Sequence, residues 1–437
     1  MSKNRRLSIL RSKKSVLAIN GGEPVLTKPP PLVHNVGRRE LVAVTKVIRC
    51  GPLSGFLGTW SEGFFGGREV RSLEVAFAKK FDVRYAVSFN SATTALHAAL
   101  VALDIGPGDE VIVPSYTMSA SAMAVLMNGA VPIFADIDER TFNLDPISVE
   151  RRITSHTKAI MVVNLFGQAA DFDALLLIAR KHHLKIIEDN AQSPGATWRG
   201  KFTGTIGDVG VFSFNVHKTI QTGEGGMLVT NNAAYALRAQ LCRNHGEVVV
   251  DTMPNYMGGP ICGSNYRMTE ITAAMARVQL SRLNELNKKR IALARYLHQK
   301  IQKIPGIIPA YEDVNNVHVY YRFAIKVDEA VVGISRDRLA EAMTAEGFPI
   351  SKGYVKPIYL LSLFQKKRVF KNTNFPFEGA HYDGKLDYSE GICPVAERYF
   401  KKELTLTDIC QYPHTTTQVD LFIAALTKVL AHKDEIQ

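Results

Sequence analysis

The sequence predicts an α/β protein built around a mostly parallel sheet of seven strands. Short runs rich in β-branched residues alternate with helical stretches from residue 85 onward, and this alternation is typical of a parallel sheet wrapped by helices. The expected strands cover residues 85–89, 110–113, 131–134, 159–163, 184–187, 209–213 and 226–230. Such sheets bind ligands at the carboxyl ends of their strands, so functional residues are expected there.

A long helical pattern connects this sheet to a smaller C-terminal part. Apolar residues recur at helical spacing from 269 to 304, where Pro305 and Gly306 end the pattern. Beyond it, the sequence predicts a strand over 317–327 and helices over 336–346 and 417–432, which make an α+β layer. We therefore expect four parts: a basic tail (1–15), a large domain with an N-terminal arm (16–268), a linking helix (269–304) and a small domain (305–437).

Composition and charge narrow the class of protein. The chain has 437 residues, of which 46% are hydrophobic, and a formal net charge of +12. Six basic residues in segment 1–15, which has no acid, supply half of that charge, and this tail is expected to be disordered. After residue 15 there is no dense block of Lys and Arg, so no nucleic-acid partner is expected and small phosphate-bearing ligands fit the charge better.

Other features argue against a metal, disulfide or membrane protein. The five cysteines are scattered and form no Cys-x-x-Cys pair, which argues against a disulfide framework and a structural zinc site. Apolar stretches end too soon to span a bilayer, and no apolar core of a signal peptide follows the basic tail. We expect no metal and no membrane partner, and the predicted location is the cytoplasm.

Lys218 and Asp189 carry the strongest chemical signal. Lys218 precedes the glycine-rich run TGEGG at 222–226, and Asp189 ends an apolar run. Pyridoxal 5'-phosphate (PLP) chemistry needs an amine that forms a Schiff base with the aldehyde, and a carboxylate that keeps the pyridine nitrogen protonated. Each residue alone has a plainer interpretation, the lysine as a solvated loop residue and the acid as a helix cap or a surface charge. Their combination predicts a PLP enzyme.

Further residues at strand ends fit the same cofactor. Ser91, Ala92 and Thr93 begin an Ala/Leu-rich helix directly after a strand, where free N–H groups and the helix dipole favour a phosphate. A plain N-cap is the alternative. Tyr116 follows the next strand and could stack on the pyridine ring or be a core tyrosine. Gln192 could hydrogen-bond the phenolic oxygen of the ring or cap a neighbouring loop.

The ordered set of motifs resembles the DegT/DnrJ/EryC1/StrS family of sugar aminotransferases. The motifs are Ser91-Ala92-Thr93, GPGDEVIVP (106–114), EDNAQ (188–192), GDVGVFSF (207–214), Lys218 with TGEGG (222–226) and GSNYRMTE (263–270). The resemblance covers roughly residues 17 to 432, and the ordered set is far more specific than any one motif. It implies the fold of type I aspartate aminotransferases and a homodimer whose two active sites are completed across the interface.

The resemblance also implies a role for each site residue. Lys218 would be the Schiff-base lysine and Asp189 the pyridine partner, and these two would be the catalytic residues. Gln192 would contact the ring oxygen and Tyr116 would stack on the ring. The remaining positions are phosphate ligands within one chain (Ser91, Ala92, Thr93 and Ser213), a phosphate ligand for the neighbouring subunit (Asn265) and substrate-binding residues (Tyr266 and Arg267).

The implied reaction is a transamination. Glutamate or glutamine would donate an amino group, which a nucleotide-linked keto-sugar or a keto-cyclitol would receive in a ping-pong cycle. Two alternatives stay open: a PLP-dependent sugar dehydratase, in which histidine replaces the Schiff-base lysine, and a non-catalytic PLP-binding regulatory protein of the same fold. Two positions depart from the family pattern, Asn215 where histidine is common and Ala92 where glycine is common.

Overall fold

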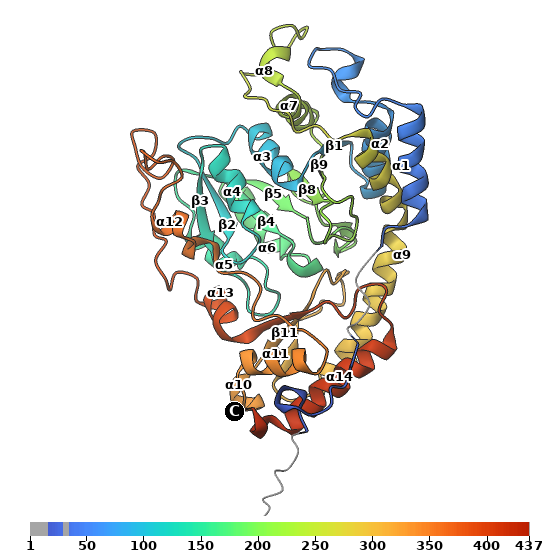
Figure 1. Cartoon of the computed structure of the whole chain (residues 1–437). Coiled ribbons are helices and arrows are strands. Elements are labelled where there is room, and N and C mark those ends of the chain that lie inside the picture. The colour runs from blue at the N-terminus through green and yellow to red at the C-terminus, as the bar shows by residue number, and fades with distance from the viewer. Residues whose placement is uncertain (1–15, 29–34, 437) are drawn as a thin grey trace, which may run out of the picture.

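The computed structural model describes residues 16–28 and 35–436, so the predicted basic tail (1–15) lies outside the described residues. A seven-stranded sheet lies at the centre of the fold (Figure 1). Its strands, in spatial order, are β1 (Tyr85–Phe89), β9 (Gly226–Thr230), β8 (Val209–Ser213), β5 (Lys185–Asp189), β4 (Thr157–Val163), β2 (Glu110–Pro114) and β3 (Val131–Ala135). Strand β9 is antiparallel to both of its neighbours and the other pairs are parallel, which confirms the predicted α/β sheet.

Helices cover both faces of this sheet. They are α3 (Ala92–Ala102), α4 (Ala120–Met127) and α7 (Ala233–Arg243) on one face, and α5 (Pro146–Arg151) and α6 (Phe172–Lys181) on the other. Met161 of β4 packs in the core shared with the first group, whereas its neighbours Ile160 and Val162 pack in the core shared with the second. Alternate residues of a strand point to opposite faces, so a strand covered on both sides must be apolar throughout.

Three more helices close the β1 edge of the sheet. Helix α2 (Arg68–Phe81) packs beside β1 and the long helix α9 (Glu270–Ile301), and α1 (Arg38–Cys50) lies along α9 (Figure 1). Phe77 and Phe81 of α2 contact Phe212 of β8, with ring centroids 5.0 and 4.7 Å apart. The side chain of Thr269 caps α9 by accepting a hydrogen bond from the Thr272 amide. The helix expected over 269–304 is thus present, and it ends at Ile301.

The C-terminal part holds a second, antiparallel sheet of β10 (Ile307–Pro309), β11 (Phe323–Val327) and β12 (Leu404–Thr407). The sequence predicted only β11, and it placed the start of that strand too early. Residues 317–321 form a loop because Tyr320 has a left-handed backbone, with φ of 49°, and the Val319 amide donates to the Gly167 carbonyl at 2.8 Å. Helices α10 (Glu329–Val332), α11 (Arg336–Ala345) and α14 (Thr416–Ala431) pack on this small sheet.

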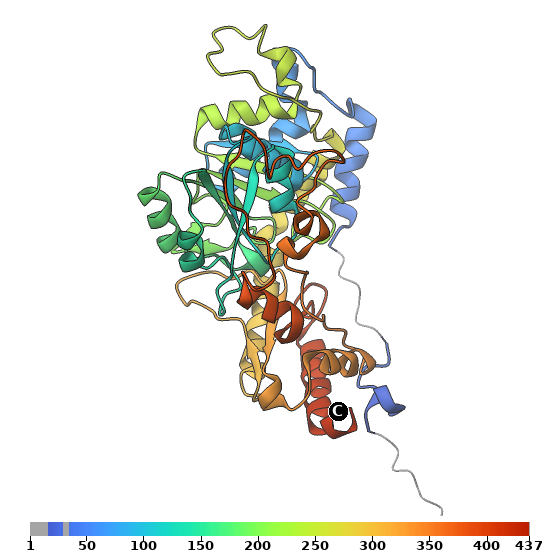
Figure 2. The same ribbon diagram turned by 90° about the vertical axis from the view of Figure 1, so that its left-hand side faces the viewer.

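Segment 354–399 leaves the small sheet and lies against the large one. The Tyr388 hydroxyl donates to the Pro132 carbonyl at 2.8 Å, and the Phe364 ring lies 5.0 Å from the ring of Phe134. Figure 2 shows this segment, with its short helices α12 (Ser362–Gln365) and α13 (Pro394–Arg398), running along the side of the large sheet. The division into domains stays a prediction, but this segment contributes side chains to the large core.

The N-terminal arm packs beside α14, at the end of the molecule that holds the small C-terminal sheet (Figure 1). Leu17 is buried in the core of the small C-terminal layer, and the Lys428 ammonium donates to the Glu23 carbonyl at 2.6 Å. The remaining short elements are α8 (Gly246–Val249), β6 (Thr197–Trp198), β7 (Lys201–Phe202), η1 (Ala18–Asn20), η2 (Glu62–Phe65), η3 (Leu165–Gly167), η4 (Ile358–Leu360), η5 (Tyr399–Glu403) and η6 (Lys433–Glu435). Within the described ranges, no helix has the length and apolar character needed to cross a membrane.

Candidate active site

Most of the candidate residues lie along one edge of the large sheet. Parallel strands end at the same edge, and β1, β2, β5 and β8 are followed there by Ser91, Tyr116, Gln192 and Lys218, in that order. Strand β9 runs the other way and therefore begins at this edge, with Gly226 paired to Ser213, the last residue of β8. This is the edge at which the sequence predicted the site.

Asp189, the last residue of β5, is a buried carboxylate that has no basic partner. It is 5% exposed, and its two oxygens accept hydrogen bonds from the Ser121 hydroxyl at 2.8 Å and the Ala191 amide at 3.1 Å. Burial raises the pKa of the Asp189 carboxyl, although the nearby charge of Lys218 acts in the opposite direction. No ion pair within 4.0 Å forms at Asp189 in the described part of the chain, so this acid can still accept a cationic N–H donor.

Lys218 lies in the turn that follows β8, with its amine against an aromatic ring. Its side chain is half-buried, and the Nζ atom lies 4.6 Å from the centre of the Tyr321 ring. The Lys218 amide donates to the Asn215 carbonyl at 2.8 Å, and the Asn215 side chain donates to Glu224 at 3.0 Å, so the turn is closed by its own residues. Tyr321 was not predicted from the sequence, since it lies in the loop taken for the start of a strand.

Tyr116 and Gln192 are tied to a tyrosine from the C-terminal part. The buried Tyr116 hydroxyl accepts from the Tyr354 amide at 2.9 Å, and the Gln192 side-chain amide donates to the Tyr354 hydroxyl at 3.1 Å. The Gln192 carbonyl oxygen accepts from the Phe166 amide at 2.9 Å. Burial raises the pKa of the Tyr354 phenol to about 12, so it stays protonated. No local signal marked Tyr354, because it follows Tyr116 by 238 residues.

The turn from β1 to α3 forms a cradle of backbone amides. Ser91 caps α3 by accepting from the Thr94 amide at 3.2 Å, whereas the amides of Ala92 and Thr93 have no hydrogen-bond partner in the described part of the chain. Gly226 touches this turn so closely that a Cβ atom there would lie 2.6 Å from the Ala92 nitrogen. Free amides at the start of an 11-residue helix fit a phosphate group.

Segment 265–267 lies beside the cradle and not inside it. Asn265 is exposed, and its side-chain oxygen accepts from the Arg267 amide at 3.4 Å. The Tyr266 carbonyl accepts from the Asn90 amide at 2.9 Å, and the Arg267 guanidinium donates to the Asn244 side chain at 2.8 Å. Within the described residues, none of these three side chains hydrogen-bonds to Lys218, Asp189 or the cradle.

The Gly- and aromatic-rich stretch at 51–67 is a packed loop in this protomer. Phe56 and Phe64 are buried, and the rings of Trp60 and Phe65 pack on Phe64 with centroids 5.3 Å away. The Asn244 side chain donates to two carbonyls of this loop. Because Asn244 also accepts from Arg267, the Asn244 side chain links this loop to segment 265–267.

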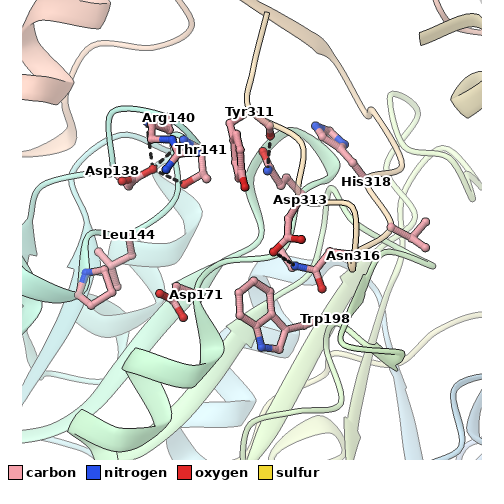
Figure 3. A pocket seen from close by; sticks show the side chains of 14 residues that line it. Asp138, Arg140, Thr141, Leu144, Asp171, Trp198, Tyr311, Asp313, Asn316 and His318 are labelled. Carbon is pink, nitrogen blue, oxygen red and sulfur yellow. Dashed lines mark hydrogen bonds between the residues drawn. The ribbon is translucent and has the colours of Figure 1, made fainter. Parts of the chain in front are cut away.

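A separate pocket of about 240 Å³ contains none of the predicted site residues (Figure 3). Trp198, Tyr311 and His318 line it together with three aspartates. The Arg140 guanidinium lies 3.8 Å from the centre of the Tyr311 ring, and the Asp138 carboxylate is engaged by the amides of residues 140 and 141. Arg140 and Asp138 thus already have partners within the pocket, whereas Asp189 at the edge that carries Lys218 has no basic partner.

The protein has the architecture of an α/β aminotransferase, with a large sheet, a small C-terminal layer, and a lysine and a carboxylate at the strand ends. Residues 59–387 match the DegT/DnrJ/EryC1/StrS aminotransferase family, and the chain belongs to this family. This finding confirms the predicted family, fold class and class of enzyme.

Two relatives and one solved structure place the chain further. It is 42% identical over 296 residues to the GDP-perosamine synthase of Caulobacter vibrioides, covering 68% of this chain and 78% of that protein. It is 36% identical over 435 residues to the L-glutamine:2-deoxy-scyllo-inosose aminotransferase of Streptoalloteichus tenebrarius, covering 96% and 99%. The X-ray structure of S. venezuelae DesV in complex with a ketimine intermediate matches with a TM-score of 0.75 at 31% identity, covering 90% of this chain and 94% of DesV.

We predict that Asp189→Asn stabilises the protein when no cofactor is bound. The raised pKa means that the folded protein holds the Asp189 proton more tightly than the unfolded chain does, so stability is lost as the pH rises through that pKa. The variant should therefore melt at a higher temperature than the wild type at pH 8, and the difference should shrink toward pH 4.5. The exposed Asp104→Asn is the matched control. Equal melting temperatures for wild type and Asp189→Asn at pH 8 would contradict this account.

Proposed function

We propose that this enzyme is a PLP-dependent aminotransferase that moves an amino group from glutamate or glutamine to a keto-sugar or a keto-cyclitol. The observation that carries the proposal is the placement of Lys218 and Asp189 at the same sheet edge. The Lys218 amine faces the Tyr321 ring, and the Asp189 carboxylate is buried without a basic partner. PLP, when bound, supplies an electron sink that makes the bonds of an attached amine labile.

The residues of this edge fit each part of the cofactor. The free amides of Ala92 and Thr93, with the hydroxyls of Ser91 and Ser213, would hold the phosphate. Gly226 leaves the room that this turn needs, since a larger residue would collide with the backbone. This supports PLP as the cofactor, because a phosphate cradle and a buried acid are both present on one protomer.

Two further residues, Tyr116 and Gln192, would orient the pyridine ring of the cofactor. Tyr116 would cover one face of it, and its hydroxyl is already fixed by the Tyr354 amide. Gln192 is held in a defined position by the Phe166 amide and by the Tyr354 hydroxyl, and from there it would contact the ring oxygen. Tyr116 can therefore be a core tyrosine, and Gln192 a loop cap, and both can still take part in binding the cofactor.

The chain's own catalytic groups have distinct tasks. Asp189 would keep the pyridine nitrogen protonated, since a buried carboxylate stabilises a cationic N–H donor in its reach. The Lys218 amine would accept the proton that the donor carbon loses and give it back later in the reaction. The Tyr321 ring lies against one side of that amine.

The acceptor class follows from the two relatives. One is named for GDP-perosamine and the other for 2-deoxy-scyllo-inosose, which are a nucleotide-linked sugar and a cyclitol. The second relative is also named for L-glutamine, which supports glutamine as a donor. We therefore propose a polyhydroxylated cyclic ketone as the acceptor.

We further propose a homodimer with shared active sites. Asn265 is exposed in the protomer and does not contact its own cradle, so its side chain is available to a phosphate held by a second subunit. Apolar side chains of α1, among them Leu41 and Ile48, are also largely exposed, at 65% and 61%. Such a face is typical of a subunit interface.

We predict that borohydride reduction of the cofactor-loaded protein leaves a stable PLP adduct on the peptide that contains Lys218. Reduction converts a Schiff base to a stable amine, so peptide mass spectrometry locates the lysine. Lys218→Ala should give no adduct and no visible absorption band, while Lys181→Ala, at an exposed position, should behave as wild type. An adduct on another lysine would refute the assignment.

A panel of acceptors tests the substrate class. With glutamine or glutamate as donor, we expect amine product from at least one keto-inositol or nucleotide-linked keto-sugar, because the relatives are named for these two classes. Product is measured by mass spectrometry, with Lys218→Ala as the blank. Amination of simple keto acids alone would exclude the proposed acceptor class.

Mixing two inactive variants tests the shared site. Lys218→Ala and Asn265→Ala each disable both sites of a homodimer, whereas a heterodimer has one site with both lesions and one with neither. Tagged heterodimers should therefore recover up to half of the wild-type activity per dimer. Heterodimers that stay inactive, while both variants are folded and dimeric, would show that Asn265 does not act across the interface.

A further inference from the structure

Ser121 is a buried residue of the first turn of α4, and its hydroxyl is hydrogen-bonded to the Asp189 carboxylate. The residue is 0% exposed, and its Oγ atom donates to the Oδ2 atom of Asp189 at 2.8 Å. Serine hydroxyls inside helices often return to the carbonyl of the residue four positions earlier. Within the described residues, the Ser121 hydroxyl donates to Asp189 alone. A buried hydroxyl is costly unless it is hydrogen-bonded, so the carboxylate accounts for a polar residue at this position.

This hydrogen bond joins a helix and a strand that are not consecutive in the chain. Helix α4 follows β2, and in the sheet β4 separates β2 from β5, the strand that ends in Asp189. Ile187 of β5 packs in the same core as Ala122 and Val125 of α4. Asp189 lies two residues after Ile187 and therefore points to the same face of the sheet. Ser121 thus reaches the carboxylate from a helix that covers that face.

The hydroxyl of Ser121 favours the ionised form of Asp189. Burial raises the pKa of the Asp189 carboxyl, and the hydrogen bond from Ser121 opposes this rise more strongly than the Ala191 amide or the charge of Lys218 does. The phenol of Tyr354 is a further titratable group that faces the carboxylate. An ionised carboxylate stabilises a cationic N–H donor, whereas a protonated acid has no charge to offer it.

We propose that Ser121 is a positioning residue that keeps the Asp189 carboxylate ionised and oriented for the pyridine nitrogen of PLP. The proposal rests on the proposed function of Asp189. Ser121 holds the Oδ2 atom and the Ala191 amide holds the Oδ1 atom, so both oxygens of the carboxylate are fixed. Each oxygen can accept a second hydrogen bond, and the acid therefore keeps the capacity to accept from a cationic N–H.

The contact is tested first on the protein without cofactor. Ser121→Ala should lower the melting temperature by a few degrees at pH 8 and by less than half as much at pH 4.5. Without the hydroxyl the pKa of the Asp189 carboxyl rises further, and stability is lost as the pH rises through that pKa. Ser121→Thr, which keeps a hydroxyl, should show the pH dependence of the wild type. Ser119→Ala is the matched control, because the Ser119 side chain does not cap the same helix.

A double-mutant cycle separates this role from packing. In the Asp189→Asn background no charge depends on the hydroxyl, so Ser121→Ala should lower the melting temperature equally at the two pH values. If Ser121→Ala also has the same cost at both pH values when Asp189 is present, Ser121 only fills space and the proposal is overturned.

The role toward the cofactor is tested with PLP that carries an isotope-labelled pyridine nitrogen. Nitrogen NMR distinguishes the protonated pyridine from the unprotonated one. Ser121→Ala should reduce the protonated fraction at pH 8 by roughly twofold or more, and Asp189→Asn should reduce it further, whereas Ser121→Thr and Ser119→Ala should keep it. A wild-type signal in Ser121→Ala would overturn the positioning role.

The borohydride adduct on Lys218 of the wild type reports the proposed function separately. Its absence would refute that function whatever the melting curves of the Ser121 variants show. If the adduct forms and the Ser121→Ala curves do not depend on pH, the proposed function stands and only the role of Ser121 fails.

Discussion

Two adjacent carboxylates are buried at the end of β5, and the arrangement of the site depends on how differently they are satisfied. Glu188 accepts hydrogen bonds from three backbone amides of loop 204–207, at 2.5 to 2.7 Å, and so ties that loop to the sheet. Asp189 points to the opposite face of the strand. It receives donors only from Ser121 and Ala191, and this leaves it able to bind a cation. Their surroundings, and not their residue types, make Glu188 a structural acid and leave Asp189 with unused acceptor capacity.

The edge of the sheet is completed by segments that come from far along the chain. Tyr354 reaches it from the segment that leaves the small sheet, and Tyr321 reaches it from the loop before β11. Helix α9 runs between the two parts, and its residues Asn287 and Arg290 contact the loops that follow β5 and β8. The C-terminal part of the chain thus belongs to the architecture of the site, since Tyr116 and Gln192 are both bound to Tyr354 and the Lys218 amine lies against Tyr321.

The predictions that held rest on short-range physics. The seven strands were visible because β-branched runs, punctuated by helical stretches, leave a local pattern. The rule that ligands bind at the carboxyl ends of parallel strands put Tyr116, Asp189 and Ser213 at one edge of the sheet. The strand expected from 317 was too long, because a tertiary contact with Gly167 and the left-handed Tyr320 override an extended pattern. Strands β10 and β12 are short, and they pair with a strand that is distant in the sequence. The local pattern of residues therefore did not predict them.

The sequence by itself determined the α/β sheet, the family and the chemical types at the strand ends, because these depend on residue order and local spacing. Only the tertiary structure decided which groups are buried and what faces them. Burial raises the pKa of the Asp189 carboxyl, and a ring from another element, Tyr321, lies against the Lys218 amine. Arg290 illustrates the difference, since in sequence it is one basic residue of a long helix. Folding places it under the lysine turn because α9 crosses beneath both loops.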